Sequence, residues 1–151
     1  MIVYRITLAM HSMKLLASGY PARWNSKDVK MIYTAQSRAL ACLENVVHRN
    51  SKGLHMNFNV MQILVPEEIV LQKIKETDLI KGWKEFDQMP YTQSLGDQWV
   101  RELKSVILQV PSAIVSGDSN YLLNPWHKDF HKIKLIGTDP FEFDDRIKGS
   151  L

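Results

Sequence analysis

Three polar side chains stand at nearly even spacing in the stretch ARWNSKDVKMIYTAQSRALACLENVVH (22–48). Arg23 carries a planar, permanently charged guanidinium that suits phosphate and carboxylate groups. Tyr33 offers an aromatic ring with a hydroxyl, and Glu44 offers a carboxylate that can stabilise a developing cation. Taken singly, each residue also has an ordinary explanation, as a surface arginine, a core aromatic or a solvated helix glutamate.

The position of Glu44 is the unusual feature of this stretch. A strand over 29–34 is expected to lead directly into a helix over 36–49, which Thr34 or Ser37 can cap. At about 100° per residue, one apolar stripe of this helix consists of Leu40, Leu43 and Val47. Glu44 lies at the rim of that stripe, and we therefore expect its carboxylate to face inward and to line a pocket.

The remaining pattern predicts an α+β domain with a mainly antiparallel sheet and a few helices. A second helix is expected over 92–104, where apolar residues recur at helical spacing. Further strands are expected over 2–8, 56–65, 69–74, 106–110, 112–116, 131–136 and 141–144. The last two are expected to be separated by a GTDP turn. Many strands, few helices and no strict βαβ alternation favour this fold class.

Composition limits the classes of protein to consider. With 151 residues, of which 45% are hydrophobic, the chain is long enough for one globular domain. Its net charge of +3 comes from scattered basic residues, which gives little reason to expect direct nucleic-acid binding. The single cysteine cannot form an internal disulfide. No apolar run approaches the ~20 residues of a membrane span, and no basic segment precedes the first apolar stretch. We expect a soluble, unexported, cytoplasmic protein that does not associate with membranes.

Motifs spread over the whole sequence extend the first cluster. RWN and VKMIYTAQSRALACLENVVH are followed by GDQW, VPSAIV and NYLLNPWH. In this order they resemble the RES domain, the toxin half of RES-Xre toxin–antitoxin systems. The resemblance extends from YRI (4–6) to FEFDDRI (141–147), so we expect a single RES domain over 1–151. Many members carry Gly-Gly before RWN, whereas this chain has YPARWN, which leaves the shape of the loop at the site entrance open.

The resemblance implies an ADP-ribosyltransferase-like fold and an enzyme that consumes NAD as its substrate, without a cofactor, and that arrests growth by doing so. The residues that name the family correspond to Arg23, Glu44 and Ser112, and Tyr33 matches the active-site tyrosine. Glu44, Arg23 and Tyr33 are thus expected to be catalytic. The residues expected to bind NAD are Arg5, Arg23, Trp24, Asn25, Tyr33, Ser112, Asn124 and His127.

The chemistry of NAD cleavage suits these residue types. Nicotinamide leaves as a neutral group from a cationic ring, so no general acid is needed and one carboxylate can suffice. Glu44 would stabilise the oxocarbenium ion that forms on the ribose. Arg23 would hold the pyrophosphate, with Arg5 as a second candidate. Tyr33 would stack on the nicotinamide, and Ser112 would offer a small hydroxyl.

The acceptor of the ADP-ribose adds no motif of its own. Water is the expected acceptor, which would make the protein an NAD glycohydrolase, but phosphate or a side chain of a target protein would use the same residues. A catalytically inactive RES-like module that only binds a protein is a third possibility, and the intact Arg23, Tyr33 and Glu44 argue against it. The resemblance also implies an Xre-family antitoxin that forms a hetero-oligomer around a toxin dimer, with DNA contacted only through the antitoxin.

Other candidate sites carry less weight. His127 and His131 are four residues apart, as two metal ligands on a helix can be, but no third ligand is near and we expect no metal. Asn124, which precedes a proline, could equally cap a turn. Cys42 lies among small apolar residues and is expected to be a packed thiol. No glycine-rich phosphate loop is present, which argues against a Rossmann-type or P-loop enzyme.

Overall fold

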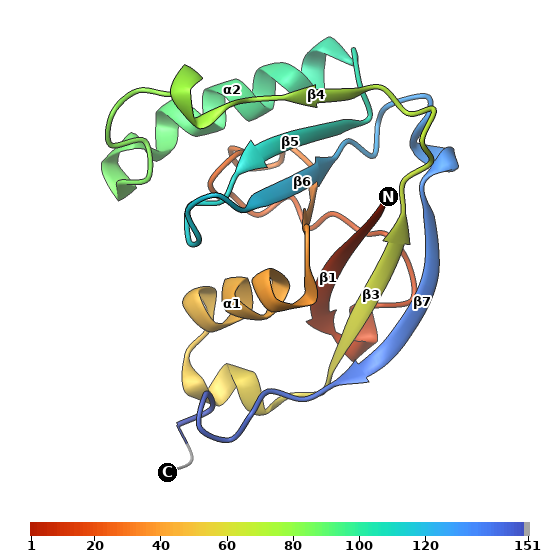
Figure 1. Cartoon of the computed structure of the whole chain (residues 1–151), viewed down its shortest axis with the longest axis vertical. Coiled ribbons are helices and arrows are strands. Elements are labelled where there is room, and N and C mark those ends of the chain that lie inside the picture. The colour runs from red at the N-terminus through yellow and green to blue at the C-terminus, as the bar shows by residue number, and fades with distance from the viewer. Residues whose placement is uncertain (150–151) are drawn as a thin grey trace.

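The computed structural model describes residues 1–149 as one seven-stranded sheet with two α-helices on it (Figure 1). The strands are β1 (Ile2–Leu8), β2 (Ile32–Ala35), β3 (Phe58–Leu64), β4 (Leu71–Lys73), β5 (Ile107–Pro111), β6 (Ser119–Leu123) and β7 (Lys134–Phe141). The helices are α1 (Arg38–His48) and α2 (Met89–Glu102). Short 3-10 turns occupy several of the connections.

The sheet is mainly antiparallel, as the sequence predicted. Its strand order is β4-β5-β6-β2-β1-β3-β7, and only the edge pair β4 and β5 runs parallel. The central pairs are antiparallel, with Tyr4 opposite Ala35 and Tyr33 opposite Leu122. β2 is therefore an inner strand, and the helix that follows it in sequence begins in the middle of the sheet.

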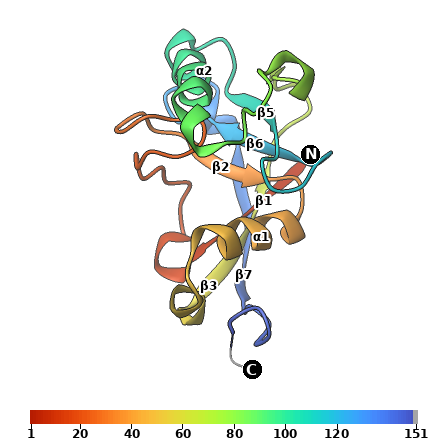
Figure 2. The same cartoon turned by 90° about the vertical axis from the view of Figure 1, so that its left-hand side faces the viewer.

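Both helices cover the same face of the sheet. Figure 1 shows them on one side of the strands, and in Figure 2 α2 lies above β6 and β2 and α1 lies below them. α1 packs on a cluster that contains Ile6, Ala35 and Val60, whereas Trp99 and Val100 of α2 pack on a second cluster. Strand alternation places a third cluster, which contains Val3 and Ile32, on the opposite face. Tyr33 thus emerges on the helix-covered face, between α1 and α2.

One predicted strand, 112–116, is a turn, and the strand that pairs with β2 lies further along. The Ser112 Oγ accepts hydrogen bonds from the backbone N–H groups of Ile114 and Val115, which folds the chain back on itself. Gly117, at φ +89°, completes the reversal. A local side-chain bond of this kind competes with a strand ladder, and apolar composition alone does not show it. β6 follows at Ser119–Leu123.

The predicted GTDP turn is wrong, because residues 137–140 lie inside the continuous strand β7. The register runs without reversal from Phe58 opposite Phe141 to Leu64 opposite Lys134, with one irregularity at Gln62 and Ile63. Pro140 is tolerated because β7 is an edge strand, where a missing N–H costs little. The expected strand at 141–144 contributes only its first residue to β7.

Other boundaries shift by a few residues. β2 begins at Ile32 and not at residue 29, β3 at Phe58, and β4 keeps only Leu71–Lys73 of the expected 69–74. α2 begins three residues before the predicted start, because Pro90 suits the first turn of a helix. It ends at Glu102, where Leu103 takes a left-handed conformation.

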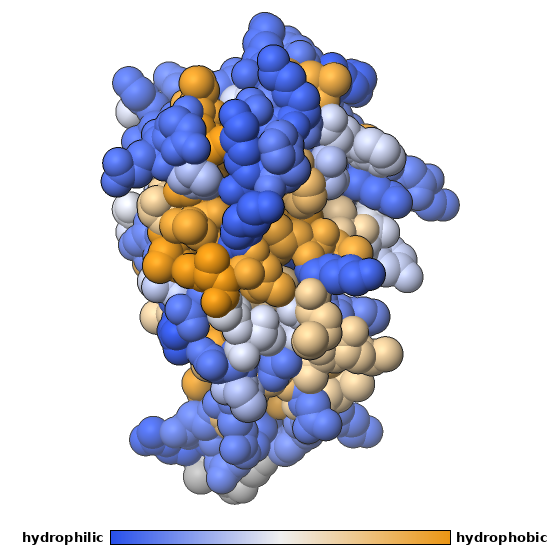
Figure 3. Space-filling view, turned by 90° about the vertical axis from the view of Figure 1, so that its right-hand side faces the viewer, coloured by the Kyte–Doolittle hydropathy of each residue, from blue (hydrophilic) through white to orange (hydrophobic). Residues whose placement is uncertain are grey.

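The right-hand side of the molecule in Figure 1, which faces the viewer in Figure 3, carries an apolar band across its middle. Exposed apolar residues at the adjoining ends of β1, β3 and β7 include Ile2, Leu64 and Ile136, and Ile2 and Leu64 are direct partners in the sheet. Within residues 1–149, neither helix is long and apolar enough to cross a membrane.

Candidate active site

Glu44 lies on the part of α1 that faces the sheet. Ser37 caps this helix by accepting the N–H of Leu40, as expected for a strand that leads directly into a helix. Leu40 and Ala41 are the buried residues of α1, and Glu44 lies between them in angle around the helix axis. Its side chain is 26% exposed, and one carboxylate oxygen lies 3.3 Å from Nε2 of His48, one turn later. Glu44 is thus neither fully solvated nor part of the packed core.

The predicted apolar stripe of α1 is correct only at Leu40. Leu43 and Val47 are exposed, while Ala41 and Asn45 face the sheet and the Asn45 amide donates to the carbonyl of Ile6. Apolar residues surround much of this helix, so periodicity alone cannot fix which side is buried. The junction with β2 fixes it, and the inward position of Glu44 remains.

Tyr33 joins β2 to the loop that carries Arg23. Its hydroxyl donates to Asn25 Oδ1 at 2.7 Å and accepts the backbone N–H of Trp24 at 3.0 Å. The Asn25 amide donates in turn to the carbonyls of Tyr20, Ser26 and Val29. Asn25 is buried, and its hydrogen-bonding capacity is used in holding the loop and the phenol. Asn25 therefore organises the site from behind.

The pKa of the Tyr33 phenol depends on burial and on the charges around it. Burial raises its pKa above the ordinary value, and the carboxylates of Asp97 and Glu44 raise it further. The Trp24 N–H and the Arg23 guanidinium act in the opposite direction. Tyr33 is therefore a neutral hydrogen-bonding group at physiological pH, and the charges of Arg23 and Glu44 both reach it. Tyr33 and Glu44 lie on the helix-covered face of the sheet, and the Tyr33 hydroxyl bonds the loop that carries Arg23.

Arg23 reaches across to the connection between β4 and α2. Its Nη1 donates to the carbonyls of Trp83 and Glu85 at 3.2 and 3.3 Å. A guanidinium has five N–H donors, so two bonds from one nitrogen leave further donors for a ligand. No acidic side chain forms an ion pair with Arg23 within residues 1–149. Among these residues, no carboxylate in direct contact neutralises the charge of Arg23.

Trp24 belongs to the core beneath the loop. Its ring lies 5.8 Å from that of Trp83, centroid to centroid, and the residue is almost completely buried. Its carbonyl lies so close to Gly96 of α2 that a Cβ at that position would be 1.8 Å from the oxygen. The Trp24 side chain therefore has almost no exposed surface with which to make the predicted contact with a ligand. Trp24 instead anchors the loop to α2.

Ser26 and Asp97 form a pair that the sequence did not identify. The carboxylate of Asp97, on α2, accepts the backbone N–H of Ser26 at 3.0 Å and its hydroxyl at 2.5 Å. The GDQW motif contains both Gly96 and Asp97. A glycine inside a helix, followed by an acid on a largely apolar face, was the available signal, since glycine in that place usually marks a close approach.

Ser112 lies on the helix-covered face but turns inward. It is buried, and its oxygen accepts the two N–H groups of the β5–β6 turn. Ala113, the next residue, packs against the cluster that contains Tyr33, and Val115 packs against the cluster under α1. Ser112 thus shapes the turn that lies between the two helices.

Arg5 stands apart from this cluster. On β1 it alternates with Tyr4 and Ile6, which face α1, and its cross-strand partner is Met61 of the opposite cluster. Its Nη1 donates to the carbonyl of Leu16 at 2.7 Å, and burial lowers its pKa. The structure does not bring Arg5 to Arg23, because neighbouring residues of a strand point to opposite faces.

Asn124 and His127 stabilise the connection after β6. The fully buried Asn124 amide donates to the Val100 carbonyl at the end of α2, and its Oδ1 accepts the N–H of Trp126. His127 accepts the N–H of Asp129 through Nδ1. Asn124 therefore caps a turn, which was the structural alternative for this residue, and neither side chain joins Arg23, Tyr33 and Glu44.

Two further expectations concern metal and thiol chemistry. Residues 1–149 contain no group of three or more His, Cys, Asp or Glu side chains arranged to hold a metal ion. His131 bonds the carbonyl of Lys128 on the surface, whereas His127 is buried. Burial raises the pKa of the Cys42 thiol, which disfavours the reactive thiolate.

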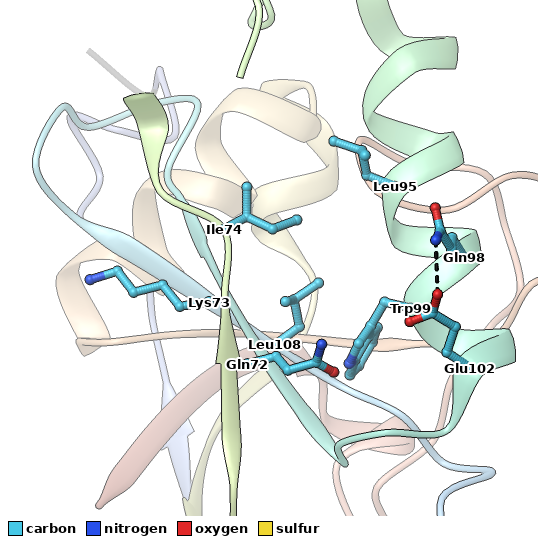
Figure 4. Close-up of a pocket in the computed structure, with 8 residues that line it drawn as sticks. All are labelled: Gln72, Lys73, Ile74, Leu95, Gln98, Trp99, Glu102 and Leu108. Carbon is cyan, nitrogen blue, oxygen red and sulfur yellow. Dashed lines mark hydrogen bonds between the residues drawn. The ribbon is translucent and has the colours of Figure 1, made fainter. Parts of the chain in front are cut away.

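A hollow of about 190 Å³ lies between α2 and the edge strand β4 (Figure 4). Leu95 and Trp99 reach it from α2, and Leu108 reaches it from β5. On its rim the Gln98 amide donates to Glu102 at 2.8 Å. None of the predicted site residues lines this hollow, so it is separate from the cluster around Tyr33.

Comparison with known proteins shows the family to which the chain belongs. The family model described as RES domain matches residues 2–144. A protein of Sphingobium sp. (strain YBL2) named Prs ADP-ribosylating toxin is 39% identical over 127 residues, which cover 83% of this chain and 79% of the relative. A protein of Yersinia enterocolitica (serotype O:8 / biotype 1B) named Toxin Res is 32% identical over 154 residues, which cover 98% of this chain and all of the relative.

A solved structure shares the fold. A chain in the crystal structure of the M. tuberculosis MbcT-MbcA toxin–antitoxin complex matches with a TM-score of 0.73, over 99% of this chain and 87% of the other, at 15% identity. This likeness shows that the two chains share one fold, and the seven-stranded sheet with its two helices confirms the expected α+β class.

Proposed function

The chain is a toxin of the RES domain family, and we propose that it acts by cleaving the N-glycosidic bond between nicotinamide and ribose in NAD. The observation that supports the proposal is that Tyr33 and Glu44 lie on the helix-covered face of the sheet, where the Tyr33 hydroxyl is hydrogen-bonded to the loop that bears Arg23. These groups supply an anion site, an aromatic platform and a carboxylate within one cluster.

The bond cleavage requires little proton transfer. The C–N bond breaks with its electron pair moving to nicotinamide, which leaves as a neutral molecule. The ribose carbon becomes an oxocarbenium ion, and the carboxylate of Glu44 stabilises that positive charge. In the hydrolytic reaction the oxygen of a water molecule bonds to this carbon and the water loses a proton, which gives free ADP-ribose.

Arg23 and Tyr33 hold the substrate in this scheme. The free donors of the Arg23 guanidinium pair with the pyrophosphate, for which a planar fork is well suited. The Tyr33 ring stacks on the nicotinamide, while its hydroxyl stays engaged with Asn25 and Trp24. The raised pKa keeps this phenol neutral, so Tyr33 positions the substrate and does not act as a base.

Arg5 has a weaker claim to the pyrophosphate than Arg23. It faces the other side of the sheet and is held by the carbonyl of Leu16. Asn25 and Ser112 support the site from within, through the loop and the turn that they organise.

Transfer of ADP-ribose to a protein is the second candidate function. The name of the 39%-identical relative, Prs ADP-ribosylating toxin, favours it. The same cleavage would occur, but the nucleophile would be an acceptor side chain in place of water. Transfer to phosphate uses the same residues again.

One experiment separates these outcomes. The purified chain, free of any partner, is incubated with NAD in the presence and absence of phosphate and of a bacterial protein extract. Nicotinamide with free ADP-ribose indicates hydrolysis, ADP-ribose phosphate indicates transfer to phosphate, and labelled protein indicates protein modification. No loss of NAD under any condition would leave only the inactive binding module.

We propose in addition that an Xre-family antitoxin controls the protein. The solved relative occurs in a toxin–antitoxin complex, which supports a partner of this kind. A carboxylate from that partner could occupy the Arg23 site and exclude NAD. The exposed apolar band of Figure 3 would suit a second toxin copy, in line with a hetero-oligomer built around a dimer.

A further inference from the structure

Helix α2 holds the loop 22–26 at four points. Thr92 donates to the carbonyl of Arg23 at 2.6 Å, and the Gln93 amide donates to the carbonyl of Ala22 at 2.9 Å. Gly96 lies directly against the Trp24 carbonyl, and Asp97 binds Ser26. Four of the five residues of the loop are thus fixed on one face of one helix. The position of Arg23 depends on this attachment.

Among these four contacts, packing alone does not explain the one between Asp97 and Ser26. It is 8% exposed, and no ion pair within residues 1–149 includes it. A buried acid without a cation costs free energy unless its oxygens are satisfied by hydrogen bonds. Both oxygens accept from the same residue, Ser26, one from the N–H and one from the hydroxyl. These two hydrogen bonds fix the direction of the Ser26 backbone as well as its distance from α2.

The two hydrogen bonds between Ser26 and Asp97 affect the positions of two site residues, Asn25 and Arg23. Ser26 follows Asn25, whose Oδ1 accepts the Tyr33 hydroxyl, and it lies three residues after Arg23. The Asp97 carboxylate also contributes to the raised pKa of Tyr33, so it lies near the phenol. A shift of the Ser26 backbone would therefore move Asn25, and with it the loop that aims Arg23.

We propose that Asp97 is a positioning residue for NAD binding, which sets the Arg23 loop through its two hydrogen bonds to Ser26. This inference rests on the proposed function, because Arg23 is taken as the pyrophosphate contact. Asp97 acts through Ser26, so its loss weakens binding by Arg23 and leaves the bond cleavage at Glu44 largely unchanged.

The test compares variants of the full chain in NAD turnover. Asp97→Asn keeps the volume but replaces one acceptor oxygen by a donor, and Ser26→Ala removes only the hydroxyl bond. We expect Asp97→Asn to raise the KM for NAD about tenfold, because hydrogen bonds to a charged acceptor are stronger than those to a neutral one. Ser26→Ala should raise the KM by a smaller factor, and kcat should stay within about threefold in both. Glu68→Gln, an exposed acid changed to its amide, is the matched control and should leave both constants unchanged.

The decisive measurement is the coupling to Arg23. If Asp97 acts by aiming the guanidinium, Asp97→Asn should raise the KM far less in an Arg23→Lys background than in the parent chain. A purely structural role would lower the melting temperature and the amount of active protein, and its effect on KM would add to that of Arg23→Lys.

Each result bears on a different proposal. A parent chain that does not consume NAD removes the proposed function, and the positioning role with it. A parent chain that is active, together with a folded Asp97→Asn variant of unchanged KM or with fully additive effects, overturns the positioning role alone. If Asp97→Asn does not fold, the same comparison is made with Ser26→Ala, and an unchanged KM there overturns the proposal.

Discussion

Tyr33 and Asn25 share a 2.7 Å hydrogen bond that ties the central strand β2 to the loop bearing Arg23. The phenol donates to the amide oxygen, and the same phenol accepts the backbone N–H of Trp24. One side chain therefore holds two groups of the loop. The charge of Glu44 on α1 also acts on the Tyr33 phenol. Tyr33 therefore connects β2, the Arg23 loop and α1.

Removing this hydroxyl should affect both stability and NAD binding. Tyr33→Phe keeps the ring but leaves Asn25 Oδ1 and the Trp24 N–H without their partner. We expect the free energy of unfolding to fall by about 1–3 kcal/mol. The KM for NAD should rise, because the Arg23 loop is released. Urea unfolding and steady-state turnover measure the two effects, and a variant with parental values in both would show that the bond has no role.

The raised pKa of Tyr33 predicts a loss of stability in alkaline solution. Burial is the main cause of the shift from the ordinary value of 10.0. The folded chain keeps a proton that the unfolded chain releases near pH 10. The free energy of unfolding therefore falls as the pH rises above that value. The free energy of unfolding should fall between pH 9 and pH 11, and Tyr33→Phe should fall less steeply. Equal slopes for the two proteins would contradict this origin.

Glu44→Gln should abolish most NAD turnover without unfolding the chain. The amide keeps the volume of the carboxylate but not the charge that stabilises the oxocarbenium ion, a loss on the order of 10²–10³ in kcat. We expect the parent chain to arrest growth when it is expressed alone, and the variant should not. Glu68→Gln serves as the control, and circular dichroism checks the fold. Full activity of Glu44→Gln would end the assignment.

Arg23→Lys should impair NAD affinity more than catalysis. Lysine keeps the positive charge but cannot present two parallel donors to a pyrophosphate. It also cannot reproduce both bonds to the carbonyls of Trp83 and Glu85 in the same geometry. We expect the KM to rise at least about tenfold with a smaller change in kcat. Unchanged constants would move the phosphate contact elsewhere, and Arg5 would be the next residue to change.

Gly96→Ala should be among the most damaging single substitutions in the chain. Its added Cβ would lie 1.8 Å from the carbonyl oxygen of Trp24, a backbone atom that cannot move without the whole loop. We expect a loss of about 3 kcal/mol or more in the free energy of unfolding, at the upper end for overpacking. Gly53→Ala is the control, because there a Cβ meets its nearest neighbour at an ordinary 3.5 Å. A stable Gly96→Ala protein would show that α2 and the loop can separate without cost.

The sequence predicted the elements that depend on local pattern and failed where tertiary contacts decide. β1 matches its predicted span of 2–8, and α1 begins and ends within two residues of the prediction. The turn at Ser112 and the continuous strand β7 depend on a side-chain bond and on pairing with β3, and periodicity contains neither. The apolar run at 112–116 therefore predicted a strand where the chain turns, and the GTDP sequence predicted a turn where β7 continues.

The candidate site shows the same division. Arg23, Tyr33 and Glu44 lie within 22 residues of one another, and the strand–helix unit that carries two of them could be predicted from their spacing. Arg5 could not be assigned to a face before the register of β1 was known. Asp97 could not be found at all from charge, because its partner Ser26 is 71 residues away in sequence. Long-range contacts of this kind are fixed by the packing of α2, and the local signal for them was Gly96 inside the helix, next to Asp97.

Control by a partner gives the last prediction. The proposed reaction would consume a cofactor on which the whole cell depends, so a chain that expresses this activity must be held inactive until needed. The uncompensated charge of Arg23 is suited to an acidic side chain or a terminal carboxylate from a partner, and its occupation would exclude NAD. We therefore expect the chain to express well only together with an Xre-type antitoxin, to co-purify with it, and to turn over NAD only after the partner is removed. Arg23→Lys should weaken this inhibition as well as NAD binding if both use the same guanidinium. Expression of the isolated chain in bacteria is the direct measurement. Normal growth, undiminished cellular NAD and a good yield of folded protein would refute both the NAD-consuming activity and the need for a partner.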